Sequence, residues 1–366
     1  MVSSGASRAP STSEPSVCPT MSRAVAGRRV ARTGVITGRR VARTGGLLTA
    51  LLLLLAVVAA SLAVGARQLP LVDAWRGLVD ESAAAYPVVH GIRLPRTLLG
   101  LLAGVALGLA GGLMQALTRN PLADPGLLGV NAGAAAAVVS AISFLGITSL
   151  GGYVWFAFAG AGLVAALVWA VGGGRAATPV RLALAGTAVN AALYAYVNAV
   201  QLLDTAALDR LRFWTVGSLA AARPATVTGI APFVAAGTLL AGVLARPLNV
   251  LVLGDDAARA LGGRPAATRA AAMVAVTLLC GAATAACGPI VFVGLMVPHL
   301  VRPLTGPDLR WLLPYCAVLA PLALLGADVL GRVLARPGEV AVGVVTAVLG
   351  GGFFLAVVRR TRMAAA

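Results

Sequence analysis

Long apolar runs separated by short polar gaps cover the chain from residue 46 onward. The first run, residues 46–66, is about 20 residues long, which is enough to cross the ~30 Å hydrocarbon core of a bilayer. The apolar stretch of a signal peptide has about 7–15 residues, so we favour an uncleaved helix. Ten such runs predict an all-α membrane protein with about ten transmembrane helices, over residues 46–66, 95–117, 127–147, 153–171, 182–203, 225–245, 270–287, 290–304, 312–333 and 340–358.

The second run carries a row of glycines at every fourth position. This spacing places them on one face of a helix, where a missing side chain lets another backbone approach closely. In lipid no water competes for the backbone hydrogen bonds, so the helix tolerates its glycines. The run is followed by TRNPLADP, residues 118–125, whose two prolines end the helix. The helix-packing face predicted in this way consists of Gly100, Gly104, Gly108 and Gly112.

Two segments between apolar runs depart from simple short loops. Residues 212–224 are too polar to span a bilayer and contain Trp214, so we expect an interfacial helix on the outer side. Residues 246–269 form the longest inner loop and contain the features of a short ordered helix. Asp255 can cap its start, Asp256 and Arg259 are helical neighbours, and Gly262 suits its end. An ordered cytoplasmic helix indicates a docking site, and a solvated linker is the alternative.

The ends of the chain are expected to be tails around one membrane domain. Residues 1–45 are rich in serine, proline and arginine, and GRRVARTG occurs there twice, at 27–34 and 38–45. We expect a disordered cytoplasmic tail near anionic lipid, although the role of the repeat and the choice of Met1 or Met21 as the start stay open. A single transmembrane domain is expected over residues 46–360, with a short C-terminal tail at 361–366.

Composition excludes several classes of protein. The chain is 59% hydrophobic and 11% charged, whereas a soluble domain carries about 25% charged residues. It contains no lysine, so it lacks the Walker A lysine that an ATPase needs. The net charge of +17 comes from arginines in the N-terminal tail and in short gaps, which is typical of cytoplasmic loops rather than of nucleic-acid binding. We therefore expect a multi-pass protein of the cell membrane with both termini inside.

Catalytic and metal-binding residues are not predicted in this chain. His90 and His299 are the only histidines, and no His, Asp and Glu set has catalytic spacing. A path for a bare divalent cation needs several protein ligands, whereas a metal inside an organic chelate does not. Asp328, near the end of the ninth run, is the only acid that we place within a span. It can form a local ion pair with Arg332, four residues later.

A polar stripe lies on the fifth predicted span. Its residues recur at helical spacing, so they share one face. Such a face either forms hydrogen bonds with a neighbouring helix or lines an aqueous path, and the pattern alone favours neither. The candidate path residues are Asn190, Tyr194, Asn198 and Gln201.

Several motifs occur in an order that resembles a known family. They are RLPR at 93–96, Gln115 with RNPLADPGLLGVNAGA at 119–134, FWTVGSL at 213–219, LGDDAARALG at 253–262, GPIVFVGLMVPHLVR at 288–302, GPDLRWLLP at 306–314 and ADVLGR at 327–332. Together they resemble the permease family of iron–siderophore and vitamin B12 ABC importers, over residues 46–360. The chain departs from that family at Glu339-Val340-Ala341, where ELP is common, at Leu309 in place of a histidine, and at GGGFF, residues 350–354.

This resemblance implies the type II importer fold and a set of partners. In the family, two ten-helix permease subunits surround a central path and work with two cytoplasmic ATPases and an extracytoplasmic substrate-binding protein. ATP and Mg²⁺ are bound by the ATPases, so no cofactor is expected in this chain. The resemblance places the path along the fifth span and binding-protein docking at Arg93, Arg96 and Arg332. It places ATPase coupling at Gly254, Asp255, Asp256, Arg259, Leu261 and Gly262.

The function expected is therefore that of a non-enzymatic permease subunit that translocates a metal chelate, with ferric siderophore as the leading substrate. Haem, cobalamin and the type of siderophore cannot be separated from sequence. A homodimer and a heterodimer with a paralogue are both compatible with the chain. An ion-coupled secondary transporter or channel is the alternative, and it would use acids or broken helices near the middle of the membrane as its coupling site.

Overall fold

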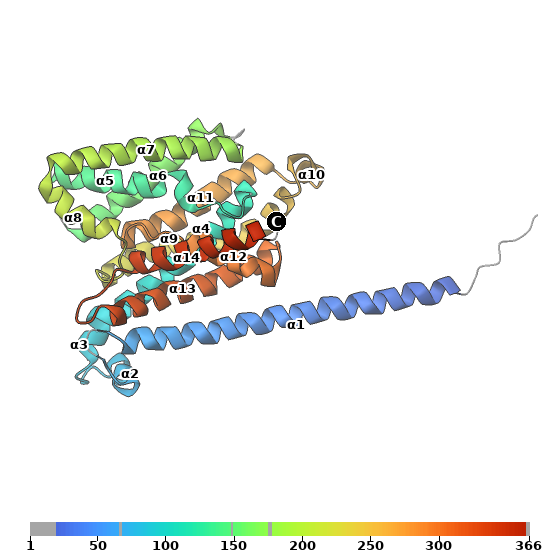
Figure 1. The fold of residues 1–366 in the computed structure, drawn as a ribbon, viewed down its shortest axis with the longest axis horizontal. Coiled ribbons are helices and arrows are strands. Elements are labelled where there is room, and N and C mark those ends of the chain that lie inside the picture. Colours follow the sequence, from blue (N-terminus) through green and yellow to red (C-terminus); the bar gives the residue numbers. More distant parts are fainter. Residues whose placement is uncertain (1–19, 66–67, 148, 175–177, 364–366) are drawn as a thin grey trace, which may run out of the picture. The chain divides into compact units, whose positions relative to one another are not determined.

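The protein is described here by a computed structural model covering residues 20–65, 68–147, 149–174 and 178–363. Within these residues every regular element is a helix (Figure 1). In chain order the elements are α1 Thr20–Ala63, α2 Leu71–Val79, α3 Tyr86–Val88, η1 Val89–Arg93, α4 Leu94–Thr118, η2 Pro125–Leu128, α5 Val130–Leu145, α6 Leu150–Val171, α7 Pro179–Leu203, α8 Thr205–Thr215, α9 Pro224–Leu251, α10 Asp255–Ala260, α11 Pro265–Cys287, α12 Val293–Thr305, α13 Leu309–Leu334 and α14 Val342–Met363.

Each of the ten predicted apolar runs coincides with one of these helices. In the described part of the chain, seven helices are long and apolar enough to cross a membrane, and α5 and α14 are apolar but shorter. Helix α12 has 13 residues and is therefore about 20 Å long, too short to cross a bilayer alone. The chain adopts left-handed backbone angles just before it, with φ of 73° at Gly288 and 69° at Phe292. The predicted all-α membrane fold is confirmed, but a full span over 290–304 is not.

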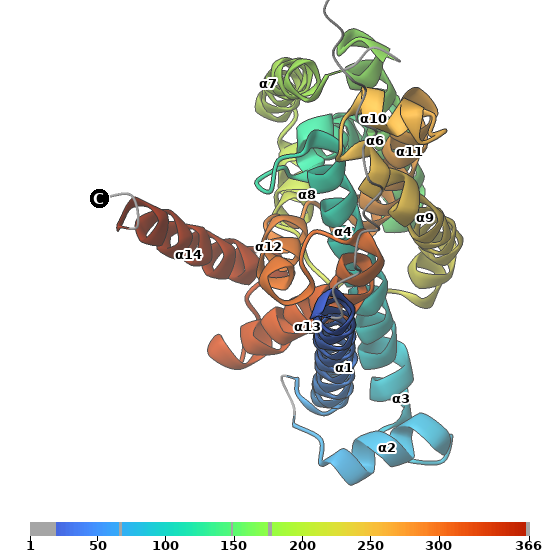
Figure 2. The same ribbon diagram turned by 90° about the vertical axis from the view of Figure 1, so that its right-hand side faces the viewer.

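Helix α4 lies in the middle of the bundle and packs against α9, α11, α12 and α13 (Figure 2). Its glycine row faces α13. Gly100 lies against Leu325, Gly104 against the backbone of Pro321, and a Cβ on Gly108 would lie 2.6 Å from the carbonyl oxygen of Cys316. Gly112 continues the row beside Leu313. Because a methyl group has no room at Gly104 or Gly108, glycine is required there for the two helices to approach this closely.

The segment around Trp214 differs from the interfacial helix predicted over 212–224. Helix α8 begins earlier, because the carboxylate of Asp204 accepts hydrogen bonds from the amides of Ala206 and Ala207. It ends at Thr215, and Gly217 follows with a φ of 75°. Residues 216–223 therefore form a turn that leads into α9, and the helix predicted there is wrong in both its limits.

The chain divides into two compact units, Met1–Gly46 and Leu47–Ala366. In the first unit, α1 begins at Thr20, within the tail that the sequence analysis expects to be disordered.

Candidate functional site

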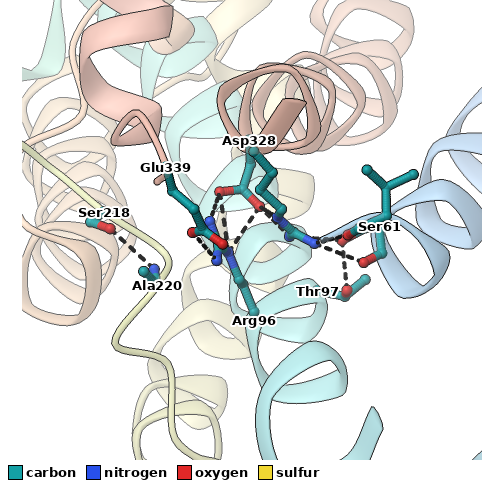
Figure 3. Close-up of polar contacts among 9 residues, drawn as sticks. Ser61, Arg96, Thr97, Ser218, Ala220, Asp328 and Glu339 are labelled. Atoms are coloured by element: carbon teal, nitrogen blue, oxygen red, sulfur yellow. Dashed lines mark hydrogen bonds and ion pairs between the residues drawn. The ribbon is translucent and has the colours of Figure 1, made fainter. Parts of the chain in front are cut away.

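A buried group of charged side chains lies where α4 begins and α13 ends (Figure 3). The guanidinium of Arg96 meets the carboxylate of Asp328 with two nitrogens, Nη2 at 2.8 Å from Oδ1 and Nε at 3.1 Å from Oδ2. Its third nitrogen, Nη1, lies 2.6 Å from Oε2 of Glu339 in the segment between α13 and α14. Arg96 thus joins three parts of the chain through charge-assisted hydrogen bonds, which are stronger than neutral ones.

Arg332 and Arg93 extend this group to the end of α1. Arg332 pairs with Asp328 and donates to the carbonyl oxygens of Ser61 and Val64, at 2.8 and 2.9 Å. Arg93 donates to the carbonyl oxygens of Leu62 and Ala63, at 2.5 and 2.7 Å. The last carbonyls of a helix have no partner within it and carry a partial negative charge, so these arginines satisfy the C-terminus of α1.

The structure brings the three predicted docking arginines together, but it does not expose them. The exposed fractions of Arg93, Arg96 and Arg332 are 5%, 6% and 2%, and Asp328 is fully buried. The family resemblance predicts binding-protein docking at these three arginines, but their burial leaves no exposed basic surface there in this chain. Its own acids and helix-end carbonyls already engage the guanidinium groups. The four-residue spacing predicts the ion pair between Asp328 and Arg332. No sequence pattern predicts that Glu339, which stands out only as a departure from a family motif, pairs with Arg96.

A cavity of about 380 Å³ lies beside Arg96. We call it the Arg96 cavity. Trp214, with 7% of its surface exposed, has an indole Nε1 that is buried without an acceptor among the described residues. The sequence pattern predicts an interfacial position for Trp214 and no association with Arg96. The Arg96 cavity is lined by polar and apolar side chains that include Arg96, Tyr153, Trp214, Ser218, Cys287 and Glu339.

The predicted polar stripe lies on α7, which forms one side of the bundle in both views (Figures 1 and 2). The side-chain amide of Asn190 donates to the carbonyl oxygen of Gly126 in η2, at 3.2 Å. Tyr194 and Asn198 are exposed, and Gln201 is half-buried. One end of the stripe therefore bonds a neighbouring element, and its middle is exposed in the single chain.

The predicted coupling residues form a short helix at the opposite end of α4 (Figure 1). Gly254, with a φ of 113°, precedes α10, and Gly262, with a φ of 78°, follows it. Asp256 pairs with Arg259 at 2.8 Å on the exposed surface, as expected from their spacing. Leu261 is 66% exposed. The exposed surface at this end of the bundle therefore consists of the short helix α10 and the apolar side chain of Leu261, which follows it.

Asp255 does not cap this helix as predicted, because it is the first residue within it. Its carboxylate instead receives two hydrogen bonds from Arg269 in α11, at 2.6 and 2.9 Å. These bonds, with the nearby charges of Arg269 and Arg119, hold the pKa of Asp255 below its usual value of 3.8. The base of α10 is thereby fixed to α11 by an ion pair that persists at neutral pH.

Arg119 adds a second connection that sequence reasoning missed. It follows α4 with a left-handed φ of 53°, and its guanidinium Nη2 lies 2.7 Å from the carbonyl oxygen of Leu251 at the end of α9. The same nitrogen lies 3.4 Å from Asp255. The motif RNP marks the end of a helix, but only the fold shows that this arginine reaches the base of α10. The end of α4 is thus linked to the end of α9 and to α10.

The part of the chain that the structure describes contains no group of three or more His, Cys, Asp and Glu side chains that could hold a metal ion. Cys280, Cys287 and Cys316 are free and buried. The described residues thus provide three features of possible functional use. These are the Arg96 cavity, the exposed polar face of α7, and the short helix α10, which ion pairs join to the rest of the bundle.

Comparison with known proteins places these features in context. The sequence model of the FecCD transport family matches residues 52–360. The ferric enterobactin transport system permease protein FepD of Escherichia coli (strain K12) is 48% identical over 319 residues, which are 85% of this chain and 93% of that protein. The hemin transport system permease protein HmuU of Yersinia pestis is 37% identical, over 87% of this chain and 95% of that protein.

A solved structure shows the same fold. It is an inward-facing conformation of a transporter assigned to the metal-chelate type of ABC transporters. The TM-score is 0.76 at 28% sequence identity, and the match covers 87% of this chain and 99% of that one.

Proposed function

This chain belongs to the FecCD transport family, and we propose that it is the transmembrane permease subunit of an ATP-binding cassette importer for an iron chelate, with ferric siderophore as the leading substrate. The observation that carries the proposal is the 48% identity to a ferric enterobactin permease over nearly the whole membrane domain. Relatives named for ferric citrate and hemin support iron chelates as the class without selecting one member.

The exposed face of α7 supports a path formed with a second subunit. Tyr194 and Asn198 are polar, yet they are exposed on a helix that is apolar enough to cross a membrane. Polar groups are costly against lipid, so this face is better suited to a water-filled path. We propose that a copy of this chain or a paralogue closes the other side of that path.

In this proposal the two ends of α4 lie on opposite sides of the membrane and contact different partners. The end with α10 faces the cytoplasm, where the exposed Leu261 and the ion pair Asp256–Arg259 meet the ATPase. The end with Arg96 faces outward, where the substrate-binding protein docks. The Arg-rich N-terminal tail and the terminal RRTR, residues 359–362, support this orientation, since arginine favours the cytoplasmic side. The docking surface would then be formed by groups other than Arg93, Arg96 and Arg332, because these are buried.

Transport in this proposal involves no covalent chemistry in the chain. ATP binding closes the partner ATPases, and α10 passes this motion to the bundle through Asp255, Arg119 and Arg269. The helices then switch between outward and inward access, a two-state gating event.

Reconstitution into liposomes tests the proposal. The permease, its ATPase and its binding protein should accumulate ⁵⁵Fe-labelled chelate only when ATP is inside, and an ATPase that binds but cannot hydrolyse ATP provides the control. Accumulation by the permease alone, driven by a proton or sodium gradient, would instead show the ion-coupled secondary transporter.

A further inference from the structure

Helix α2 connects two membrane-spanning segments and carries exposed apolar side chains along one side. These residues stand at the first, second, fifth and ninth positions of the helix. Successive residues of an α-helix are about 100° apart around its axis, so all four lie within one sector of about 100°. We call this sector the α2 stripe. It consists of Leu71, Val72, Trp75 and Val79, with exposed fractions of 63%, 60%, 65% and 63%.

The other two sides of α2 have a different character. Ala74 and Gly77 are buried and form the side that faces the protein. Asp73 and Arg76 occupy the remaining side, and the carboxylate of Asp80 follows at the end of the helix. The helix thus has one side packed on the protein, one side that is apolar and exposed, and one side that is charged. An amphipathic helix of this kind is typical of the boundary between lipid and water.

The buried side of α2 contacts the beginning of the next membrane-spanning segment. A Cβ on Gly77 would lie 3.0 Å from a methyl carbon of Val89, and Nε2 of His90 lies 3.1 Å from the carbonyl oxygen of Leu78. The segment that is apolar enough to cross the membrane begins at Tyr86. Both views show α2 beside α3, at one end of the bundle and on its periphery (Figures 1 and 2).

These contacts determine the depth of α2 relative to the membrane. A helix rises by about 1.5 Å per residue, so Val89 lies about 5 Å inside the start of the span at Tyr86. Interfacial helices place their apolar side about 5–10 Å into the boundary between headgroups and acyl chains. Because α2 packs against the first turn of the span, its exposed stripe lies at the depth where the acyl chains begin.

The residue types on and beside the α2 stripe suit this depth. Tryptophan is enriched where a membrane meets water, because its ring is apolar and its N–H is polar, and Trp75 lies in the middle of the stripe. Arg76 borders the stripe, and its long side chain can reach the lipid phosphates while its stem covers apolar surface. Val88 and Ile92, which are 39% and 56% exposed, add apolar surface on the segment that α2 packs against.

We propose that α2 lies along the membrane surface as an interfacial helix, with the α2 stripe in contact with the acyl chains of the lipids and the side that carries Asp73 in water. The partner of this surface is the lipid bilayer itself. The proposal requires that the chain spans a membrane, and it is independent of the transported substrate. Through the contacts with Val89 and His90, α2 would hold the start of the second span at the membrane surface.

Fluorescence quenching of Trp75 in the full-length protein tests the proposal. The protein is placed in phosphatidylcholine nanodiscs whose lipids are either unmodified or brominated near the headgroup end of the acyl chains, and iodide is the quencher in water. The chain has five tryptophans, so the emission of Trp75 is taken as the difference between the unchanged protein and Trp75→Phe. We expect brominated lipid to quench most of this difference emission and iodide to quench little of it.

Two variants in the Trp75→Phe background provide matched comparisons. Val79→Trp keeps an indole on the α2 stripe, one turn later, and should be quenched like Trp75. Asp73→Trp places it on the charged side, where iodide should quench it several-fold more strongly than brominated lipid does. Melting temperatures equal to that of Trp75→Phe show that the variants are folded. If Asp73→Trp melts lower, Trp75 and Val79→Trp still test the proposal, because each is exposed to both quenchers.

The other outcomes would each overturn the proposal. Strong quenching of Trp75 by iodide, with little quenching by brominated lipid, would show that the α2 stripe faces water. If neither quencher reaches Trp75, the stripe is covered by protein, such as a second copy of the chain. If iodide quenches Trp75 only until a substrate-binding protein is added, the stripe is a protein-docking surface.

Discussion

Arg96 and Asp328 are 232 positions apart in the sequence, yet their side chains form a buried ion pair with a nitrogen–oxygen distance of 2.8 Å. The pair fastens the start of α4 to the end of α13, at one end of the glycine-lined contact between these helices. Arg332 shares the same carboxylate. One buried carboxylate therefore balances two guanidinium groups, and its removal would leave both without their main counter-charge.

We expect Asp328→Asn to destabilise the protein strongly. Breaking a buried ion pair by removing one partner typically costs about 3–5 kcal/mol, because the other charge stays buried and uncompensated. The measurement is the thermal unfolding midpoint in detergent. Asp209→Asn is the matched control, since Asp209 pairs with Arg212 on the exposed surface, with 66% of its side chain accessible. Equal midpoints for the two variants would show that the buried group contributes nothing to stability.

The glycine contact leads to a second prediction. Gly104→Leu places a side chain against the backbone of Pro321 and should lower the stability by at least the 1–3 kcal/mol that is typical of overpacking. Gly242→Leu on α9 is the control, because no atom lies within 4 Å of a Cβ built there. The yield of folded monodisperse protein and its melting temperature provide the measurement. If Gly104→Leu melts like the control, the α4–α13 contact is looser than the structure shows.

The base of α10 gives a prediction about coupling. Asp255→Asn removes the charge that holds Arg269 and Arg119, so we expect ATP hydrolysis to continue while chelate uptake per ATP falls several-fold. Asp256→Asn serves as the control, since Asp256 is fully exposed and its one ion pair among the described residues is with Arg259. The measurement is the ratio of uptake to hydrolysis in liposomes. Equal ratios in both variants would exclude this linkage from coupling.

The lowered pKa of Asp255 gives the same linkage a pH dependence of known sign. A carboxyl whose pKa is lowered by folding stabilises the protein above its unfolded pKa, and this contribution is lost as the pH falls through the folded value. Because the folded value lies below 3.8, the difference in coupling between the unchanged protein and Asp255→Asn should be constant from about pH 5 to pH 8. A difference that disappears within this range would assign the effect to another group.

The exposed stripe on α7 gives a prediction about the path. Asn198→Leu should reduce the rate of chelate uptake without lowering the melting temperature, because Asn198 is exposed within the chain and its loss removes a polar group from the proposed path. Leu202→Ala is the comparison on the same helix, at a residue that is 83% exposed. Uptake measured at saturating binding protein separates the two. An unchanged rate for Asn198→Leu would place this face against lipid or a partner helix.

Most of the helices can be predicted from local sequence patterns, whereas most of the contacts in the candidate site cannot. Apolar runs locate the helices because the bilayer requires a minimum apolar length, and the four-residue repeat of glycine identifies one face of α4. The turn after Thr215 was missed because the left-handed Gly217 and the cap at Asp204 determine the helix limits. The burial of Arg93 and the link from Arg119 to α10 depend on contacts between distant segments, which no local pattern records.

The glycine face of α4, against which α13 packs, has a mechanical consequence. Sliding one helix past the other by a single residue would bring a Cβ where only glycine now fits, and rotation about either axis would do the same. We therefore expect the two helices to move as one rigid body during transport, with the conformational change occurring outside their contact. Spin labels on α4 and α13 should keep the same separation in the nucleotide-free and nucleotide-bound transporter, while a change in their distance would show that the contact yields during transport.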